Sequence, residues 1–328
     1  MSRPLVNLAF LGCGAITRAH SRTLAGFRSE VRCYYACRDG TRAAALARRF
    51  GGAGSFGSYA AALIDEQVDA VLVATPPSSH LELTLSALEH GKHVIVEKPA
   101  FLRVADFAQV RDAEARSGRR VLVAENYCYK PLARKLNAIV TSGVLGEIRF
   151  VHLDAVKRQR PSGWRSDPAL AGGGALFEGG VHWIDLLAHL GLRIEAVHGF
   201  RPGDWRGAER SMLIVVEYEE GAVGTLAHSW EVPSPFRGLR ISRIYGTRGS
   251  VAFESNGLFI LITGPRPKLI LPGFRDISGY RAMFRDFLDA LATGGEPLMS
   301  LDRAQRGLEL IEAAYRNAPS TPSLATVP

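Results

Sequence analysis

Short apolar runs alternate with amphipathic stretches through the first 124 residues. The runs are mostly apolar and lie at 5–11, 31–37, 68–74, 94–96 and 120–124. Runs of this kind are typical of parallel strands buried on both faces. Most of the stretches between them have apolar positions at helical spacing. Residues 1–124 are therefore predicted to form a doubly wound parallel sheet with helices on both faces.

After about residue 125 the pattern changes to longer strands of alternating apolar and polar positions. Such strands are predicted at 148–155, 211–219, 223–230, 240–245 and 251–253. They lack intervening helices, which favours a large open, mostly antiparallel sheet with one face covered. Apolar positions at helical spacing over 277–291 and 304–314 predict helices that face the core. Residues 125–328 are therefore predicted to form a second α/β domain.

The formal net charge of +8 is spread over single arginines and short pairs. The longest basic cluster, at 157–160, has no neighbouring aromatic ladder, so nucleic-acid binding is not predicted. A modest attraction for anionic cofactors or substrates is the expected consequence of the charge. No segment reaches the ~18 apolar residues of a membrane span, so no membrane partner is expected.

The cysteines indicate a reducing, cytoplasmic environment. Neither metal-type spacing nor a disulfide-dense pattern is present among the four of them, Cys13, Cys33, Cys37 and Cys128. The apolar amino terminus resembles a signal peptide in part. Asn7, Gly12 and Gly14 interrupt that run, however, so we expect a cytoplasmic protein.

The first predicted strand runs into the sequence GCGAIT at 12–17. This is a G-x-G-x-x pattern with Thr17 where a third glycine would stand. The first two glycines permit a tight turn and close approach of the backbone to a pyrophosphate, which then faces a helix N-terminus. Small residues also form ordinary strand–helix turns, but the position at the start of the alternating pattern favours dinucleotide binding. The residues predicted to hold the pyrophosphate are Gly12, Gly14, Ala15 and Ile16.

The second predicted strand ends at Cys37, Arg38 and Asp39. NAD-binding folds place an acidic residue near this point to bind the ribose hydroxyls. Counting along the strand puts Cys37 at that position with Arg38 beside it, and an arginine there can pair with a 2′-phosphate. The sequence therefore favours NADP over NAD. In the alternative, Arg38 is solvated and Asp39 serves the ribose.

Lys98 comes directly after a buried strand, where open α/β sheets bind their ligands. The apolar run stops at Glu97, and Pro99 cannot donate to a strand ladder. Two other strand ends carry polar residues, Thr75 with Pro76 after one and Asn126 with Tyr127 after another. His80, a few residues after Pro76, is expected to start or pack a helix rather than to act as a catalyst.

A glycine-rich segment, GGGALFEGGVHWID at 172–185, leads into a predicted helix. If the helix begins near Ala175, Glu178, His182 and Asp185 share one face. Glu178 could then orient His182, which could accept a proton near neutral pH. Carboxylate–histidine–carboxylate sets also bind divalent ions, but no second histidine lies nearby in register, so no metal is expected.

Taken together, these motifs are similar to those of the Gfo/Idh/MocA family of NAD(P)-dependent oxidoreductases, over nearly the whole chain. The resemblance is carried by GCGAIT, ATPPSSH, GKHVIVEKP and GGGALFEGGVHWID, in that order. It implies an N-terminal Rossmann domain and a C-terminal α/β domain. The open sheet of the second domain usually makes the interface of a dimer or tetramer, so a homodimer or homotetramer is expected.

The resemblance also implies roles for individual residues. The family's EKP lysine, tied to catalysis and to the substrate hydroxyl, falls on Lys98, and its acid/base histidine falls on His182. The family's aspartate four residues earlier is replaced by Glu178, which reaches about 1.5 Å further, so its role as orienter or substrate contact is in doubt. The sugar pocket implied by the resemblance is lined by Asn126, Tyr127, Trp164, Arg165 and Asp185.

The predicted activity is hydride transfer between NADP or NAD and a secondary alcohol or ketone of a sugar, cyclitol or related polyol. His182 would take the hydroxyl proton during oxidation, and Lys98 would hydrogen-bond the same oxygen. The residues expected to flank the cofactor are Thr75, Pro76, His80 and Glu97, the last near the nicotinamide ribose.

Three alternatives stay open. A non-catalytic regulator that binds a dinucleotide or a sugar is one, because of Glu178. A second is an enzyme that uses tightly held NAD for glycoside cleavage by transient oxidation. Reduction of a non-sugar ketone or imine is the third.

Overall fold

The computed structural model describes residues 5–203, 207–234 and 238–318. The chain divides into two compact units. The first unit comprises residues 1–125 and 280–305, and the second comprises residues 126–279 and 306–328.

The first unit contains a six-stranded parallel sheet in the order β3-β2-β1-β4-β5-β6. Its strands are β1 (Val6–Leu11), β2 (Val31–Ala36), β3 (Gly54–Phe56), β4 (Ala70–Val73), β5 (His93–Glu97) and β6 (Val121–Ala124). The strand order reverses between β1 and β4, which is the point where doubly wound sheets bind their ligands. The predicted Rossmann-like sheet is confirmed.

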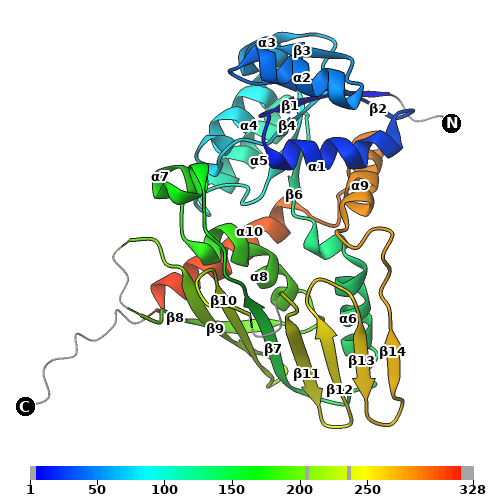
Figure 1. Ribbon diagram of the computed structural model, residues 1–328, viewed down its shortest axis with the longest axis vertical. Coiled ribbons are helices and arrows are strands. Elements are labelled where there is room, and N and C mark those ends of the chain that lie inside the picture. Colours follow the sequence, from blue (N-terminus) through cyan, green and yellow to red (C-terminus); the bar gives the residue numbers. More distant parts are fainter. Residues whose placement is uncertain (1–4, 204–206, 235–237, 319–328) are drawn as a thin grey trace, which may run out of the picture. The chain divides into compact units, whose positions relative to one another are not determined.

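Helices pack on this sheet in two groups, α1 with α2 and α9, and α4 with α5 (Figure 1). The helical segments of the unit are α1 (Ala15–Leu24), η1 (Ala25–Phe27), α2 (Gly40–Phe50), α3 (Tyr59–Ile64), η2 (Pro77–Ser79), α4 (His80–Glu89), α5 (Asp106–Ser117) and α9 (Tyr280–Thr293). The core between the layers consists of buried strand residues such as Phe10, Leu72 and Leu122, each almost fully excluded from solvent. Their burial on both faces of the sheet explains the uninterrupted apolar runs of the sequence.

The second unit contains an eight-stranded sheet in the order β14-β13-β12-β11-β7-β10-β9-β8. Its strands are β7 (Ile148–Val156), β8 (Ile194–Phe200), β9 (Ser211–Tyr218), β10 (Val223–Ser229), β11 (Ile241–Gly246), β12 (Ser250–Glu254), β13 (Ile260–Thr263) and β14 (Lys268–Ile270). All neighbouring pairs are antiparallel except β7 with β10. The prediction of an open, mostly antiparallel sheet is confirmed.

Helical segments cover one face of this sheet. They are η3 (Tyr127–Tyr129), α6 (Pro131–Thr141), η4 (Gly163–Ser166), α7 (Pro168–Ala171), η5 (Leu176–Gly180) and α8 (Val181–Ala188); α10 (Leu301–Arg316) begins in the first unit and ends in the second. The hydroxyl of Tyr218 on β9 donates to the carbonyl of Leu187 on α8 at 3.1 Å, which ties α8 to the covered face.

The opposite face of the sheet carries exposed apolar side chains. Phe150 of β7 lies level with Val223 of β10 and Tyr245 of β11, and all three are exposed. On the next strands, Leu213 lies level with Phe200, and both are again exposed. Scattered apolar residues on a surface are ordinary, but a contiguous group on one face is typical of an interaction surface.

Candidate active site

The glycine loop after β1 approaches neighbouring backbone closely. Gly12 has a φ of +119°, and a Cβ there would lie 2.4 Å from the carbonyl oxygen of Ala74. Only glycine fits such a position without strain. Thr17 occupies the position of the third glycine of the G-x-G-x-x-G pattern. Its hydroxyl donates to the carbonyl of Gly12 at 2.8 Å. The threonine therefore fastens the loop to the first turn of α1.

The N-terminus of α1 is suited to bind an anion. Gly14 is the N-cap residue, and in the described part of the chain no side chain caps this helix. The first turn, which begins at Ala15 and Ile16, contains no acidic residue, and a Cβ on Gly14 would meet nothing within 4 Å. The backbone N–H groups of this first turn lie at the positive end of the helix dipole, next to the open space beside Gly14. These residues fit the pyrophosphate of a dinucleotide.

At the end of β2, Cys37 is buried, whereas Arg38 and Asp39 are exposed. The Asp39 carboxylate caps α2, because it accepts from the Thr41 N–H at 3.0 Å, the Thr41 hydroxyl at 2.6 Å and the Arg42 N–H at 3.3 Å. The hydrogen bond from the Thr41 hydroxyl, with smaller contributions from Arg42, lowers the pKa of Asp39. The carboxylate of Asp39 is therefore already engaged as the N-cap of α2.

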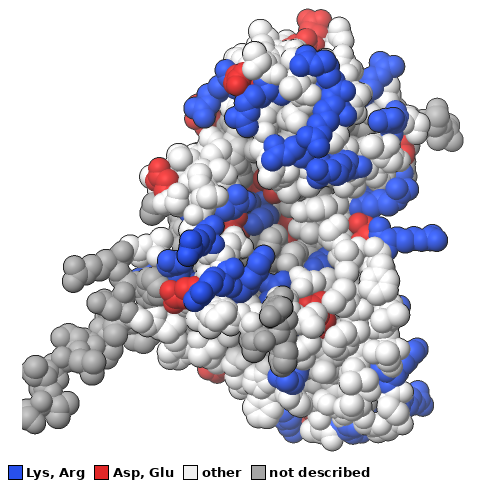
Figure 2. All heavy atoms as spheres, in the orientation of Figure 1, with Lys and Arg blue, Asp and Glu red and all other residues white. Residues whose placement is uncertain are grey.

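Arg42, in the first turn of α2, extends the basic character of this corner. Its guanidinium donates to the carbonyl of Cys13 in the glycine loop at 3.3 Å. Figure 2 shows Lys and Arg side chains gathered over the region of the first unit that contains α1 and α2, with few acidic side chains among them. Arg42 was not predicted from the sequence. Its basic side chain so soon after β2 is the feature that could have identified it as a candidate.

The loop after β4 is joined to the loop after β5 by His80, which is 1% exposed. Its Nε2 lies 2.9 Å from the carbonyl oxygen of Thr75, and its Nδ1 lies 2.9 Å from that of Pro99. Burial lowers the pKa of His80. Pro76 and Thr75 are partly exposed at the carboxyl edge of the sheet. His80 thus holds the two loops together, as the packing interpretation of this residue expected.

Lys98 follows β5 at the same edge of the sheet as the glycine loop, because the carboxyl ends of parallel strands share one edge. Glu97 is buried, and its Oε2 accepts from the backbone N–H of Lys98 at 3.2 Å. Oε1 of Glu97 contacts Nε2 of His20 on α1. No motif in the sequence singled out His20, whose partner lies 77 positions away.

In the second unit, the glycine-rich segment does not form the continuous α-helix that the sequence suggested. Residues 176–180 form a π-helical turn, η5, before α8 begins at Val181. The wider π turn changes the angular spacing of side chains, so Glu178 and His182 are not related by the expected α-helical i, i+4 geometry. The expected shared face is therefore corrected for Glu178 alone, because His182 and Asp185 both lie within α8.

Glu178 is 5% exposed, and its Oε1 accepts from Nε of Arg165 at 2.9 Å. The guanidinium of Arg165 also lies over the ring of Trp164, with its carbon 4.3 Å from the ring centroid. A buried carboxylate needs a cationic or hydrogen-bonding partner. Arg165 provides this partner. Glu178 therefore lies together with Arg165 and Trp164, two of the residues predicted to line the pocket.

His182 is stacked on Tyr127, with ring centroids 4.2 Å apart and an interplanar angle of 11°. Lys130 places its ammonium 4.2 Å from the centroid of the same tyrosine ring, and Trp183 meets the ring edge-on at 5.4 Å. The predicted residues Tyr127 and His182 are therefore brought together. Lys130 was missed, since a lysine before a helix gave no distinctive signal.

The two remaining residues of the predicted sugar pocket, Asp185 and Asn126, form contacts with neighbouring protein groups. Asp185 is buried, and its Oδ1 lies 3.1 Å from Nδ1 of His189. The Asn126 side-chain amide donates to the carbonyl of Ser278 at 2.6 Å. Among the described residues, no group of three or more His, Cys, Asp or Glu side chains could hold a metal ion.

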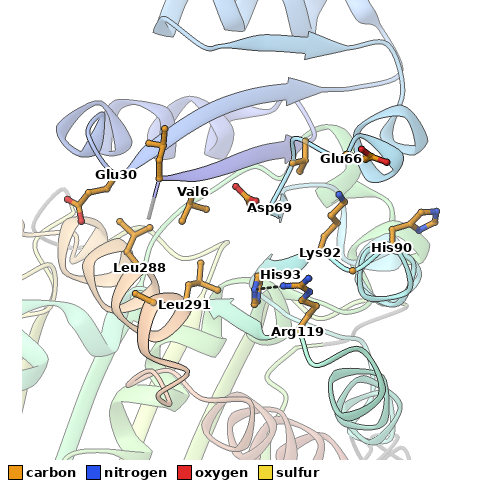
Figure 3. A pocket seen from close by; sticks show the side chains of 14 residues that line it. Val6, Glu30, Glu66, Asp69, His90, Lys92, His93, Arg119, Leu288 and Leu291 are labelled. Carbon is orange, nitrogen blue, oxygen red and sulfur yellow. Dashed lines mark hydrogen bonds between the residues drawn. The ribbon is translucent and has the colours of Figure 1, made fainter. Parts of the chain in front are cut away.

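A cavity of about 470 Å³ lies at the amino edge of the parallel sheet (Figure 3). Its wall combines apolar side chains such as Val6 and Leu288 with charged ones of both signs, Asp69 and Arg119 among them. The candidate cofactor residues of the first unit lie at the opposite, carboxyl edge of this sheet. The candidate residues of the second unit that stack or pair lie on its own η3, η4, η5 and α8 segments.

Comparisons with known proteins identify the family of the chain. Residues 6–125 match the family model described as "Oxidoreductase family, NAD-binding Rossmann fold", and residues 133–252 match the "GFO/IDH/MocA C-terminal domain". D-glucoside 3-dehydrogenase of Escherichia coli (strain K12) is 24% identical, over 97% of this chain and 96% of that protein. D-xylose 1-dehydrogenase (NADP(+)) 2 of Haloferax volcanii is 28% identical, over 86% of this chain and 88% of that protein.

Among solved structures, GenD2 from gentamicin A biosynthesis, in complex with NAD, superposes with a TM-score of 0.82 at 26% identity. The match covers 96% of this chain and 94% of that chain. No helix in the described residues is long and apolar enough to cross a membrane. With both domain models matched, the chain belongs to the Gfo/Idh/MocA family of oxidoreductases and is an NAD(P)-dependent dehydrogenase or reductase acting on CH–OH groups.

Proposed function

We propose that the protein transfers a hydride between a nicotinamide dinucleotide and a secondary alcohol or ketone of a small sugar-like polyol. The observation that carries the proposal is the shared edge of the first sheet, where the uncapped helix after Gly14 and the lysine after β5 both lie. Relatives named as glucoside and xylose dehydrogenases support a sugar as substrate. The dinucleotide, when bound, supplies the hydride acceptor or donor.

Each protein group has a separate task in this proposal. Lys98 hydrogen-bonds the reacting oxygen of the substrate and stabilises its developing negative charge. His182 takes the hydroxyl proton during oxidation and returns it during reduction. Tyr127 holds the imidazole plane by stacking, and Glu178 fixes Arg165 at the pocket wall.

The remaining pocket and cofactor assignments also enter the proposal. Asn126, Trp164, Arg165 and Asp185 shape the sugar pocket. Thr75 and Pro76 flank the cofactor directly, while His80 acts by holding their loop against the one that follows β5. Glu97 lies near the nicotinamide ribose.

We favour NADP as the cofactor. Arg38 is exposed, and Arg42 reaches the glycine loop from the next helix. Asp39 is engaged as the cap of α2, which weakens the alternative in which it binds the ribose hydroxyls. Two guanidinium groups at this corner suit a 2′-phosphate.

We further propose a homodimer or homotetramer assembled through the open face of the second sheet. The exposed apolar group formed by Phe150, Val223 and Tyr245 supports this assembly. A cytoplasmic location is supported by the four cysteines, none of which forms a disulfide among the described residues.

The first test is a fluorescence titration with NADPH and NADH on the wild type, Arg38→Ala and Arg48→Ala. The last variant is a matched control, because it removes the same charge from the far end of α2. Loss of a charge-assisted pair should weaken NADPH binding about 10-fold or more in Arg38→Ala alone. Equal NADH and NADPH binding, unchanged in Arg38→Ala, would overturn the NADP assignment.

The second test is turnover of a panel of free sugars, glycosides and cyclitols with the preferred cofactor, for the wild type and Lys98→Met. Turnover of at least one sugar by the wild type, lost in the variant while dinucleotide binding persists, supports the proposal. Dinucleotide binding without turnover of any member would turn the assignment towards a regulator.

A further inference from the structure

The EKP segment has a buried partner on the first helix of the chain. His20, on α1, is fully excluded from solvent, and its Nε2 contacts Oε1 of Glu97. Glu97 is the last residue of β5 and directly precedes Lys98. One side chain therefore links the helix that follows the glycine loop to the residue before the predicted catalytic lysine.

Within the described part of the chain, the ring of His20 makes one polar contact, the one with Glu97. The rings of Tyr280 and Phe284 on α9 meet it edge-on, each with a centroid separation of 5.1 Å. Its Nδ1 is buried and has no hydrogen-bond partner among the residues that the structure describes. With aromatic edges packed against the ring, the imidazole cannot turn away from Glu97.

Glu97 uses both carboxylate oxygens within the first unit. Oε1 binds His20, and Oε2 accepts from the backbone N–H of Lys98 at 3.2 Å. Burial alone would raise the pKa of Glu97, but the hydrogen bond and charge of His20, followed by the charges of Lys98 and His80, lower it overall. The carboxyl is therefore an anion, fixed in one orientation beside Lys98.

We propose that His20 is a positioning residue for Lys98. It keeps Glu97 ionised and oriented so that the carboxylate fixes the Lys98 backbone and faces its ammonium with a fixed negative charge. The proposal rests on the proposed function, in which Lys98 acts on the substrate oxygen. A buried ion pair is weak evidence of a role in fold stability, since apolar residues of similar volume often stabilise a protein as well as the pair does.

The test compares three variants at positions that contact no substrate in the proposal. His20→Phe keeps an aromatic ring and removes the donor. His20→Gln keeps a donor, because the side-chain amide nitrogen of glutamine can occupy the position of Nε2. Phe284→Leu is the matched control, since it loosens the same aromatic packing and changes neither partner of the His20–Glu97 contact.

In His20→Phe, Glu97 keeps its burial and loses its main partner, so its pKa should rise. We expect kcat to fall at least 10-fold near neutral pH, and the acid limb of the kcat profile to move to higher pH. The KM for the dinucleotide should change less than 3-fold. His20→Gln should restore most of kcat, and Phe284→Leu should lower the melting temperature without moving the acid limb.

A purely structural role predicts a different result. His20→Phe and Phe284→Leu would then both lower the melting temperature, with kcat per folded molecule and the acid limb unchanged in each. That outcome, or failure of His20→Gln to restore kcat in a folded protein, overturns the proposal. If His20→Phe does not fold, Glu97→Gln, which removes the charge, must reproduce the loss of kcat.

A measurement that does not depend on substrate turnover tests the role of His20 separately from the proposed function. The chain has only six lysines, so reductive methylation with ¹³C-formaldehyde gives few NMR signals, and Lys98→Arg identifies that of Lys98. We expect this signal to be displaced in His20→Phe and unchanged in His20→Gln. An unchanged signal in His20→Phe would overturn the positioning role, even if no sugar is ever turned over.

Discussion

The ring of Tyr127 lies flat against the ring of His182, 4.2 Å away between centroids. Tyr127 belongs to η3 and His182 to α8, so two separate helical segments fix the plane of the imidazole. The ammonium of Lys130 on the tyrosine ring adds a cation–π contact to this group. An imidazole held in this way can present a ring nitrogen in a constant direction.

Removal of the stacking ring should therefore impair proton transfer. A stacked aromatic pair is worth about 0.5–1.5 kcal/mol, so Tyr127→Ala should lower kcat roughly 2- to 12-fold with little change in the KM for the dinucleotide. Tyr127→Phe keeps the ring and should retain activity. Steady-state kinetics check both variants, and an equal loss in Tyr127→Phe would instead assign the phenol hydroxyl to the substrate.

The two glycines of the first loop should respond differently to alanine. Gly12→Ala places a Cβ against the Ala74 carbonyl at a positive φ. It should lower the melting temperature, because backbone strain of this kind alone costs about 1–3 kcal/mol. Gly14→Ala meets no neighbouring atom, so it should keep the melting temperature and weaken dinucleotide binding by crowding the helix N-terminus. Thermal denaturation and dinucleotide titration distinguish the two effects, and reversed results would contradict the role given to Gly14.

Stability should fall in weakly acidic solution partly because of His93. Its Nδ1 accepts from the Arg120 N–H at 3.0 Å, and burial, followed by the charges of Arg119 and Arg120, lowers its pKa below 6.5. The folded state thus prefers the neutral ring. The resulting stabilisation is complete above pH 6.5 and is lost as the pH falls through the lowered pKa.

His93→Asn tests this pH dependence, because its amide oxygen can replace Nδ1 as acceptor and does not titrate. Chemical denaturation at several pH values should show a smaller loss of unfolding free energy on acidification for the variant than for the wild type. Identical pH dependence in both would assign the acid sensitivity to other groups.

The open face of the second sheet should control assembly. Leu213 on β9 and Leu258, between β12 and β13, are almost equally exposed, at 39% and 38%. Leu213 lies level with the exposed Phe200 on β8, whereas Leu258 lies in the connection between two strands. Leu213→Asp should shift the protein to a smaller species in analytical ultracentrifugation, while Leu258→Asp should not. A monomeric wild type would contradict the proposed assembly.

The parallel sheet could be predicted because its strands are buried on both faces and therefore consist mostly of apolar residues. These strand residues lie between Leu8 and Val123 in the sequence. β3 was missed because Gly54–Phe56 is only three residues long and contains no apolar run. The carboxyl edge of the sheet followed from topology, which placed Lys98 and the glycine loop there without any structure. Long-range side-chain pairing did not follow, since no local pattern links His20 to Glu97.

The glycine-rich segment shows a second limit. Its periodicity predicts an α-helix, yet residues 176–180 form a π turn. The backbone there is constrained by close neighbours: a Cβ on Gly174 would overlap the carboxylate of Glu209, and one on Gly180 would press on Leu176. Glu209 also accepts from the Leu176 N–H at 2.8 Å. Tertiary contacts, which a linear pattern does not contain, therefore decide the geometry around Glu178 and His182.

The single parallel pair in the second sheet, β7 with β10, has a consequence for how this protein can diversify. Parallel neighbours require a long connection, and the chain between Val156 and Val223 contains Trp164, Glu178 and His182. Lengthening a loop costs little, about 0.6 kcal/mol for each doubling. Insertions in the loops of that connection can thus reshape the proposed substrate wall while the register of Phe150 with Val223 stays fixed. The scaffold can be inherited unchanged while its specificity evolves.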